Sequence, residues 1–167
     1  MTHPFDILKL DHGAHFILTP CPGTKETSVL DALTALKAAG ADAVITMMTM
    51  PELMGHGTDT IPDVCKTLGI SWFHLPVEDS CAPEAPFEQA YAAVKDELSA
   101  LMNAGKTVVI HCHGGSGRTG MMAAILMLAA GYGSETVRAK IQSIRPKSLK
   151  SAVQVAYLEA KHGYQNY

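Results

Sequence analysis

Short runs of consecutive apolar residues alternate along the chain with longer segments whose apolar residues recur at helical spacing. We predict strands for the apolar runs, at residues 14–19, 43–48, 70–75 and 107–110. We predict helices at residues 27–39, 58–68, 87–103, 119–130, 134–144 and 149–162, and loops at 49–57 and 76–86. Continuously apolar strands are typical of parallel sheets that helices cover on both faces. The alternation therefore predicts an α/β fold with a central, mostly parallel sheet of four to five strands flanked by helices.

The length and the apolar content predict one domain over residues 1–167. Of these 167 residues 47% are apolar, which suffices for a single core. The longest apolar run, 121–130, is well short of the about 20 residues that a membrane-spanning helix needs. A net charge of −3 and few arginines argue against binding to nucleic acid or to an anionic lipid surface. We expect a cytoplasmic monomer with no targeting segment.

Residues 111–120, HCHGGSGRTG, connect the strand predicted at 107–110 to the apolar helix that follows. The glycines within 114–117 let the backbone curl so that several N–H groups point inward, and the helix adds its positive N-terminal end. Together they form an anion cradle of phosphate size, with Cys112 at its floor and Arg118 at its rim. A planar guanidinium can bond two phosphate oxygens at once, which a lysine cannot.

The same cradle should ionise the thiol of Cys112. A helix terminus stabilises a negative charge by at most ~2 kcal/mol, so loop N–H groups and nearby donors must supply the remainder. Thr119 offers a hydroxyl and Arg118 is a permanent cation. We therefore predict that Cys112 is a thiolate near pH 7 and a nucleophile at phosphorus. The alternative, a tight glycine-rich turn around a buried cysteine, accounts for less of the pattern.

Two histidines, His111 and His113, flank Cys112 and could suggest a metal site. A metal cation would compete with the anion cradle, and neither the glycines nor the arginine would serve it. We predict no metal and no cofactor.

Cleavage of a phosphomonoester also needs an acid that protonates the leaving oxygen. In parallel sheets the loops after neighbouring strands meet at the carboxyl edge, so the loop after residues 70–75 should lie beside the cysteine loop. Asp79 is our choice for this acid and Glu78 is the reserve. An aspartate before a serine is, on its own, more often a turn residue, and only the cysteine loop makes Asp79 a candidate.

The remaining cysteines are Cys21, Cys65 and Cys81, and no pair has CxxC spacing. Reduced, buried thiols are the default interpretation. Cys81 follows Asp79 by two positions and could form a protective disulfide with Cys112, whereas Cys21 and Cys65 are weaker candidates.

The HCxxGxxRT/S pattern is the signature of the cysteine-dependent protein tyrosine and dual-specificity phosphatases. Residues 18–162 resemble the kinase-associated phosphatase branch of that superfamily. Weaker similarities lie at 18–23, at Glu52-Leu53, at 76–79 and at Gln154. The resemblance implies a protein tyrosine phosphatase-like fold of the dual-specificity type.

The resemblance also implies a role for each matching residue. Cys112 attacks phosphorus and forms a phosphocysteine, and Arg118 binds the phosphoryl group. Asp79 protonates the leaving oxygen and then activates water. Thr119 helps the sulfur leave, and His111 orients the loop and helps hold the thiolate. The substrate-binding residues that it implies are His113, Gly114, Gly115, Ser116, Gly117, Arg118 and Gln154.

Three features qualify the resemblance. Gln154 would position the hydrolytic water, and a surface position on the last helix is the alternative. Ser80 follows Asp79 where the relatives have glycine, which leaves both the identity of the acid and the mobility of its loop open. Residues 49–57 contain no lysine or arginine, only His56, so recognition of the protein partner of the eukaryotic relatives is not assumed.

The variable positions of the loop, within 113–117, carry no lysine or arginine, which favours a singly phosphorylated substrate. We expect phosphotyrosine, or phosphoserine and phosphothreonine, in proteins or peptides, with dual specificity. Other possibilities are a weakly catalytic phospho-binding module and a phosphatase for a non-protein phosphate ester. A rhodanese or an arsenate reductase fits the motif less well.

Overall fold

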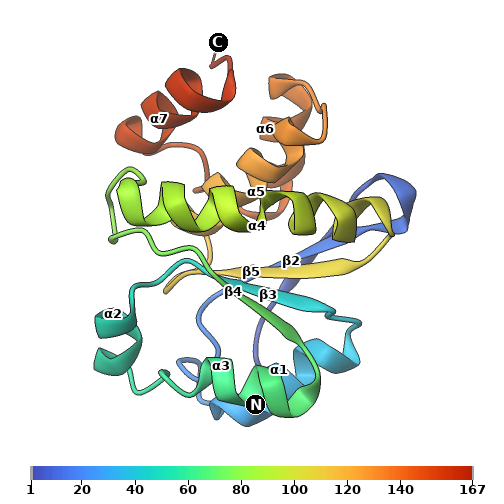
Figure 1. The fold of residues 1–167 in the computed structure, drawn as a ribbon, viewed down its shortest axis with the longest axis vertical. Helices are drawn as coiled ribbons and strands as arrows, with labels where there is room; N and C mark the ends of the chain where they lie inside the picture. The colour runs from blue at the N-terminus through green and yellow to red at the C-terminus, as the bar shows by residue number, and fades with distance from the viewer. Residues whose placement is uncertain (1, 167) are drawn as a thin grey trace.

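A five-stranded sheet forms the centre of the computed structural model, which describes residues 2–166 (Figure 1). The strand order is β1-β2-β5-β3-β4, and only the β1–β2 pair is antiparallel. The strands are β1 (Asp6–Lys9), β2 (His15–Thr19), β3 (Ala43–Thr46), β4 (Ser71–His74) and β5 (Thr107–His111). This arrangement confirms the predicted α/β class and the mostly parallel sheet.

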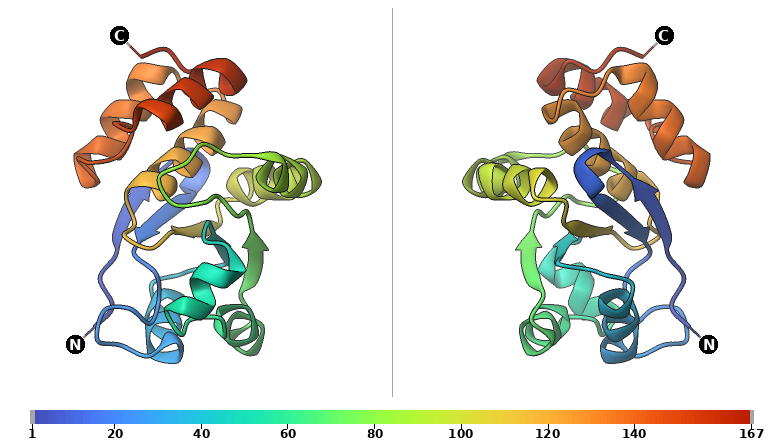
Figure 2. Two further views of the ribbon diagram at one scale, coloured as in Figure 1. Left: turned by 90° about the vertical axis from the view of Figure 1, so that its left-hand side faces the viewer. Right: turned by 90° about the vertical axis from the view of Figure 1, so that its right-hand side faces the viewer.

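Helices cover both faces of the sheet, as Figures 1 and 2 show. One face carries α1 (Val29–Ala38), α2 (Met50–Gly55) and α3 (Ile61–Leu68). The other carries α4 (Ala85–Asn103), α5 (Gly117–Ala129), α6 (Ser134–Ile144) and α7 (Ala152–His162). Alternate residues of a strand point to opposite faces. Thus Ile17, Val44 and Val109 belong to the core beneath α1 and α3, whereas Phe16, Ile45 and Ile110 belong to the core beneath α4 and α5.

Helix α5 is buried along most of its length. All ten residues from 118 to 127 are buried, as its continuous apolar sequence predicted. Within residues 2–166, no helix is both long enough and apolar enough to cross a bilayer.

The sequence analysis missed strand β1 and the helix α2. Strand β1, with the sequence DILK, lies at the edge of the sheet and buries only Leu8. A strand with one buried residue has no apolar pattern by which the sequence could predict it. The α2 segment contains Pro51 and ends at Gly55, which favoured a loop. Proline is tolerated in the first helical turn, however, and the hydroxyl of Thr49 caps the helix by accepting a hydrogen bond from the Glu52 N–H at 3.3 Å.

The last helix begins later than predicted. Residues 149–162 were expected to be helical, but α7 starts at Ala152. Leu149 adopts a left-handed conformation with φ of 62°, which interrupts the helix on that side.

Candidate active site

The loop after β5 and the first turn of α5 form a curled segment at the carboxyl edge of the sheet. Two backbone hydrogen bonds of 3.0 Å hold this segment: the Met47 N–H donates to the His111 carbonyl, and the Cys21 N–H donates to the His113 carbonyl. Gly115 has φ of 83°, and a Cβ there would lie 2.6 Å from the backbone of Pro20. Only glycine fits this conformation and this close approach, so Gly115 is needed for the loop to curl against β2.

The thiol of Cys112 lies at the base of this loop and is 3% exposed. Its Sγ accepts hydrogen bonds from the Gly115 N–H at 3.2 Å and from the Thr119 hydroxyl at 3.1 Å. Donors directed at the sulfur, together with the N-terminus of α5, stabilise negative charge on it. The thiolate at Cys112 stays a prediction.

The guanidinium of Arg118 is almost fully buried beside the loop. Its Nη1 and Nη2 donate to the two carboxylate oxygens of Glu52 at 2.7 and 2.8 Å, and Nη1 also donates to the Val77 carbonyl at 2.9 Å. A guanidinium has five N–H donors, and these bonds use three of them; a phosphoryl group would take the Nε–H and the second hydrogen of Nη2, which is also the nitrogen nearest Asp79. Burial works to lower the pKa of Arg118, but the bonded Glu52 carboxylate raises it above its ordinary value.

Glu52, on α2, holds this arginine in place and was not among the predicted site residues. The hydrogen bonds from Arg118 lower the pKa of Glu52 below its usual range, although burial opposes the shift. The only sequence signal for it was the family similarity at Glu52-Leu53, because Glu52 and Arg118 are far apart in the chain.

Asp79 extends from the loop between β4 and α4 towards the same guanidinium. Its Oδ1 lies 3.4 Å from Arg118 Nη2, and its side chain is 73% exposed. It lines the cavity that contains Cys112, whereas Glu78 lines a neighbouring cavity. Of the two predicted acids, the geometry therefore favours Asp79. Ser80 has φ of 61°, a left-handed backbone region that glycine adopts more readily than serine.

His111 is fully buried under the loop and does not contact the sulfur. Its Nδ1 lies 3.0 Å from the Cys112 carbonyl oxygen and its Nε2 lies 2.7 Å from the Thr46 hydroxyl, which also accepts from Trp72 Nε1 at 2.8 Å. This network assigns the neutral tautomer that donates from Nδ1. Burial lowers the pKa of His111 to about 4, so the ring is uncharged at pH 7. His111 contacts the backbone of the loop, and its role in orienting the loop stays a prediction. A neutral ring supplies no positive charge to a thiolate at Cys112, which does not fit the other predicted role of His111.

A cavity of about 410 Å³ opens above the loop. It is lined by Asp79, Ser80, Cys112, His113, Gly114, Ser116, Gly117, Arg118, Lys147, Ser151 and Gln154. Gln154 is 3% exposed, so the alternative of a surface position is wrong. Lys147 belongs to the turn between α6 and α7, and nothing in its sequence context indicated that it would reach this cavity.

Comparison with known proteins gives the family. Residues 23–162 match the family described as Swiss Army Knife protein, DSP-PTPase phosphatase domain. The chain belongs to this phosphatase family. The match covers all of the candidate site, from the α2 glutamate to Gln154.

Curated relatives of this phosphatase-family chain are named cyclin-dependent kinase inhibitor 3. The protein from Sus scrofa is 31% identical over 121 residues, and that from Homo sapiens is 28% identical over the same length. These alignments cover 71% of this chain and 54% of each relative, so the chain spans about half the length of the curated relatives it matches.

Solved structures of similar fold include the kinase associated phosphatase in a form with serine at its catalytic-site cysteine. The two chains superpose with a TM-score of 0.80 and 20% identity, and 99% of each is covered. The active form of Tk-PTP gives a TM-score of 0.69 and 22% identity, with 94% of this chain and 96% of that one covered. This fold agrees with the protein tyrosine phosphatase-like fold that the sequence resemblance implied.

The other three cysteines of this phosphatase-family chain are free thiols. Burial raises the pKa of Cys21 to about 11 and that of Cys65 to about 12, so both are protonated at neutral pH. Cys81 is half-buried in the loop that carries Asp79, where its N–H donates to the Glu78 carbonyl. A protective disulfide between Cys81 and Cys112 remains a prediction.

Proposed function

We propose that this chain hydrolyses phosphomonoesters of phosphorylated proteins through a phosphocysteine intermediate. The observation that carries the proposal is the convergence on one cavity of a sulfur with two hydrogen-bond donors, a buried arginine and an exposed carboxyl group. These are Cys112, Arg118 and Asp79. Cys112 follows β5, Arg118 lies in the first turn of α5, and Asp79 belongs to the loop after β4.

The first step transfers the phosphoryl group to sulfur. Arg118 would bind two phosphoryl oxygens through its Nε and Nη2 hydrogens, and the loop N–H groups would bind the others. The Cys112 thiolate attacks phosphorus, the bond from phosphorus to the ester oxygen breaks, and Asp79 gives its proton to that oxygen. The products are the dephosphorylated hydroxyl group and a phosphocysteine.

The second step releases phosphate. A water attacks phosphorus, Asp79 takes a proton from it, and the sulfur leaves as a thiolate. The Thr119 hydroxyl, already 3.1 Å from Sγ, stabilises the charge that returns to the sulfur. Gln154, at the wall of the cavity, would position the water. Apart from the attacking water, the groups named in these steps are side chains and backbone N–H groups of the chain.

A phosphoprotein substrate agrees with the names of the relatives, cyclin-dependent kinase inhibitor 3 and kinase associated phosphatase. Phosphotyrosine and phosphothreonine or phosphoserine would both be accepted. Lys147 is the one lysine among the residues that line the cavity, which favours a single phosphoryl group over a polyphosphorylated ligand.

Hydrolysis of para-nitrophenyl phosphate between pH 5.5 and 7.5, in reductant and with or without EDTA, tests the chemistry. The wild type should turn over in both conditions, Cys112→Ser should be inactive, and Cys81→Ser, which removes a thiol from the neighbouring loop, should remain active. Activity in Cys112→Ser would contradict the nucleophile. An inactive wild type that still binds phosphate would be a phospho-binding module, and sulfite release from thiosulfate would indicate a rhodanese.

A further inference from the structure

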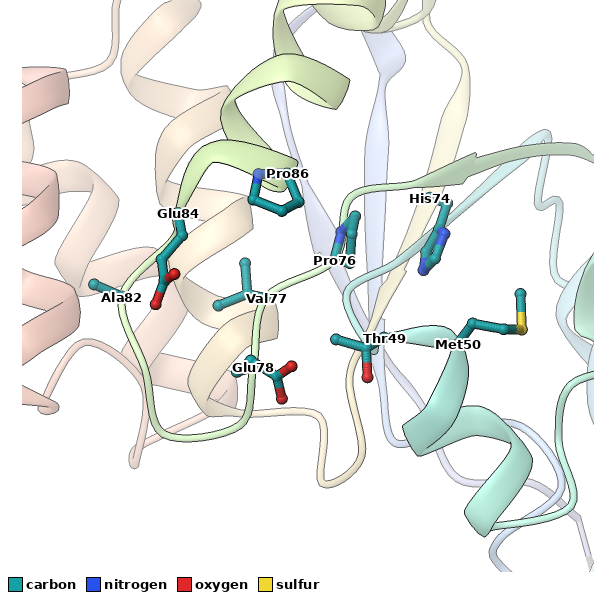
Figure 3. Close-up of a pocket in the computed structure, with 9 residues that line it drawn as sticks. All are labelled: Thr49, Met50, His74, Pro76, Val77, Glu78, Ala82, Glu84 and Pro86. Carbon is teal, nitrogen blue, oxygen red and sulfur yellow. The ribbon is translucent and has the colours of Figure 1, made fainter.

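A second cavity of about 240 Å³ lies beside the reaction cavity and takes no part in the proposed chemistry. Its walls are the start of α2 and the loop from β4 to α4 (Figure 3). It is lined by Thr49, Met50, His74, Pro76, Val77, Glu78, Ala82, Glu84 and Pro86. The loop from β4 to α4 contributes to both cavities, with Glu78 lining the second and its neighbour Asp79 lining the reaction cavity, so a ligand of the second would lie near the phosphoryl group.

The lining combines apolar side chains with two carboxylates. Met50, Pro76 and Val77 supply an apolar surface, while Glu78 and Glu84 are exposed and extend beside Val77 (Figure 3). Within residues 2–166 neither glutamate forms an ion pair, and Glu84 does not use its carboxylate to cap α4. None of the described residues that line the cavity is a lysine or an arginine. An aliphatic chain with a cationic end, as in lysine and arginine, matches this combination.

His74 also lines the cavity and is hydrogen-bonded within the protein. Its Nε2 lies 2.7 Å from the Met48 carbonyl oxygen and donates to it. The ring therefore already has a partner, whereas the two exposed carboxylates are open to a ligand.

The connection to the reaction cavity is short. Glu78 directly precedes Asp79, the Val77 carbonyl accepts from Arg118, and Thr49 caps the helix that carries Glu52. An extended peptide advances about 3.3 Å per residue, so a residue within about three positions of the phosphorylated one can reach this cavity.

We propose that this second cavity binds the side chain of a lysine or arginine that lies within about three residues of the phosphorylated residue in the substrate. The proposal rests on the phosphoprotein substrate of the proposed function. It makes Glu84 and Glu78 specificity-determining residues of the site. Lys147 lines the reaction cavity and not the second cavity.

Peptide binding to Cys112→Ser tests this proposal without requiring turnover. Phosphopeptides with a single lysine at positions −3 to +3 are compared with matched peptides that carry norleucine or alanine there. At one or two positions lysine should bind about two- to fivefold more tightly than norleucine, the range of one exposed ion pair. Norleucine should bind more tightly than alanine, because its stem covers the apolar wall.

Glu84→Gln in the same background should reduce the lysine-to-norleucine ratio towards one. Glu97→Gln, which removes the same charge from an exposed position further along α4, should leave the ratio unchanged. Raising the salt from about 0.05 to about 0.5 M should also shrink the ratio, since screening weakens exposed ion pairs. This second measurement does not depend on the folding of a new variant.

A lysine preference absent at every position, or one that survives both Glu84→Gln and high salt, would overturn the proposal. Failure of all the peptides to bind would overturn it together with the phosphoprotein substrate. In parallel, the hydrolysis of para-nitrophenyl phosphate is measured for the wild type and for a Glu84→Gln variant that keeps the cysteine at position 112. It should be equal in the two, and it decides the phosphatase chemistry separately, because that small substrate does not reach the second cavity.

Discussion

Replacement of Glu52 by glutamine should destabilise the protein strongly, because Glu52 is the charged partner of a buried arginine. The Arg118 side chain is 2% exposed and the Glu52 side chain 18%, with contacts of 2.7 and 2.8 Å. Loss of one partner of a buried ion pair costs about 3–5 kcal/mol. Because Glu52 is partly solvated and Val77 still accepts from Arg118, we expect the lower end, about 3 kcal/mol. For a chain of this size that corresponds to a fall in Tm of about 6–12 °C.

The assay is thermal unfolding at pH 7, with Asp6→Asn as the matched control. Asp6 forms an ion pair with Arg145 at 3.2 Å, but its side chain is 48% exposed, so its loss should cost at most about 1 kcal/mol. The activity of Glu52→Gln should also fall, since the guanidinium is no longer held with its Nε edge towards the cavity. If the Tm of Glu52→Gln falls no further than that of Asp6→Asn, the ion pair between Glu52 and Arg118 does not stabilise the fold by about 3 kcal/mol.

The pH dependence of the difference in Tm between the wild type and Glu52→Gln gives a further check. Arg118 lowers the pKa of Glu52 in the folded state, so unfolding takes up protons at acidic pH. The stabilisation is therefore complete above the unfolded value of about 4.3 and is lost as the pH falls through the lower folded value. The Tm values of wild type and Glu52→Gln should converge below about pH 4. A constant difference would contradict the assignment.

Three other residues give independent predictions. Asp79→Asn should slow the hydrolysis of esters with poor leaving groups by about 10²–10⁴-fold, whereas Glu78→Gln should not, and the reverse result would reassign the acid. Thr119→Val removes a donor to Sγ worth about 1.5–3 kcal/mol, so release of phosphate from Cys112 should slow and stopped-flow should show a burst; an unchanged steady-state rate would remove Thr119 from the mechanism. His111 has its folded pKa lowered to about 4, so the wild type should lose about 3 kcal/mol of unfolding free energy between pH 6.5 and 4. His111→Gln should lose less over that range in urea denaturation, and equal losses would contradict the neutral buried ring.

Elements that carry their own signal were predicted from the sequence. Residues 134–144 form α6 with the predicted bounds, and the apolar run 121–130 lies almost entirely in the buried helix α5. Each has a continuous pattern that does not depend on distant residues. Strand β1 has no such pattern, because only Leu8 of its four residues is buried and the strand forms by pairing with β2.

The phosphate-sized loop is also a local structure. Residues 111–120 contain the sulfur, the arginine, the hydroxyl and the glycines, so their order in the chain was enough to predict the cradle and the family. The sequence alone also indicated that an acid should come from a neighbouring loop, since parallel strands end at one edge. It made Asp79 the choice and Glu78 the reserve, but only the structure shows that these adjacent residues line different cavities.

What only the tertiary structure decided are the contacts between segments far apart in the chain. Glu52 meets Arg118 because α2 packs beside the carboxyl end of the sheet, and Lys147 reaches the cavity through the turn before α7. The neutral state of His111 likewise depends on its burial beneath the loop and on Thr46. The sequence determined which chemical groups the loop carries, because they are consecutive. The fold determined their charge partners and their neighbours, because ion pairing and burial depend on distance in space rather than along the chain.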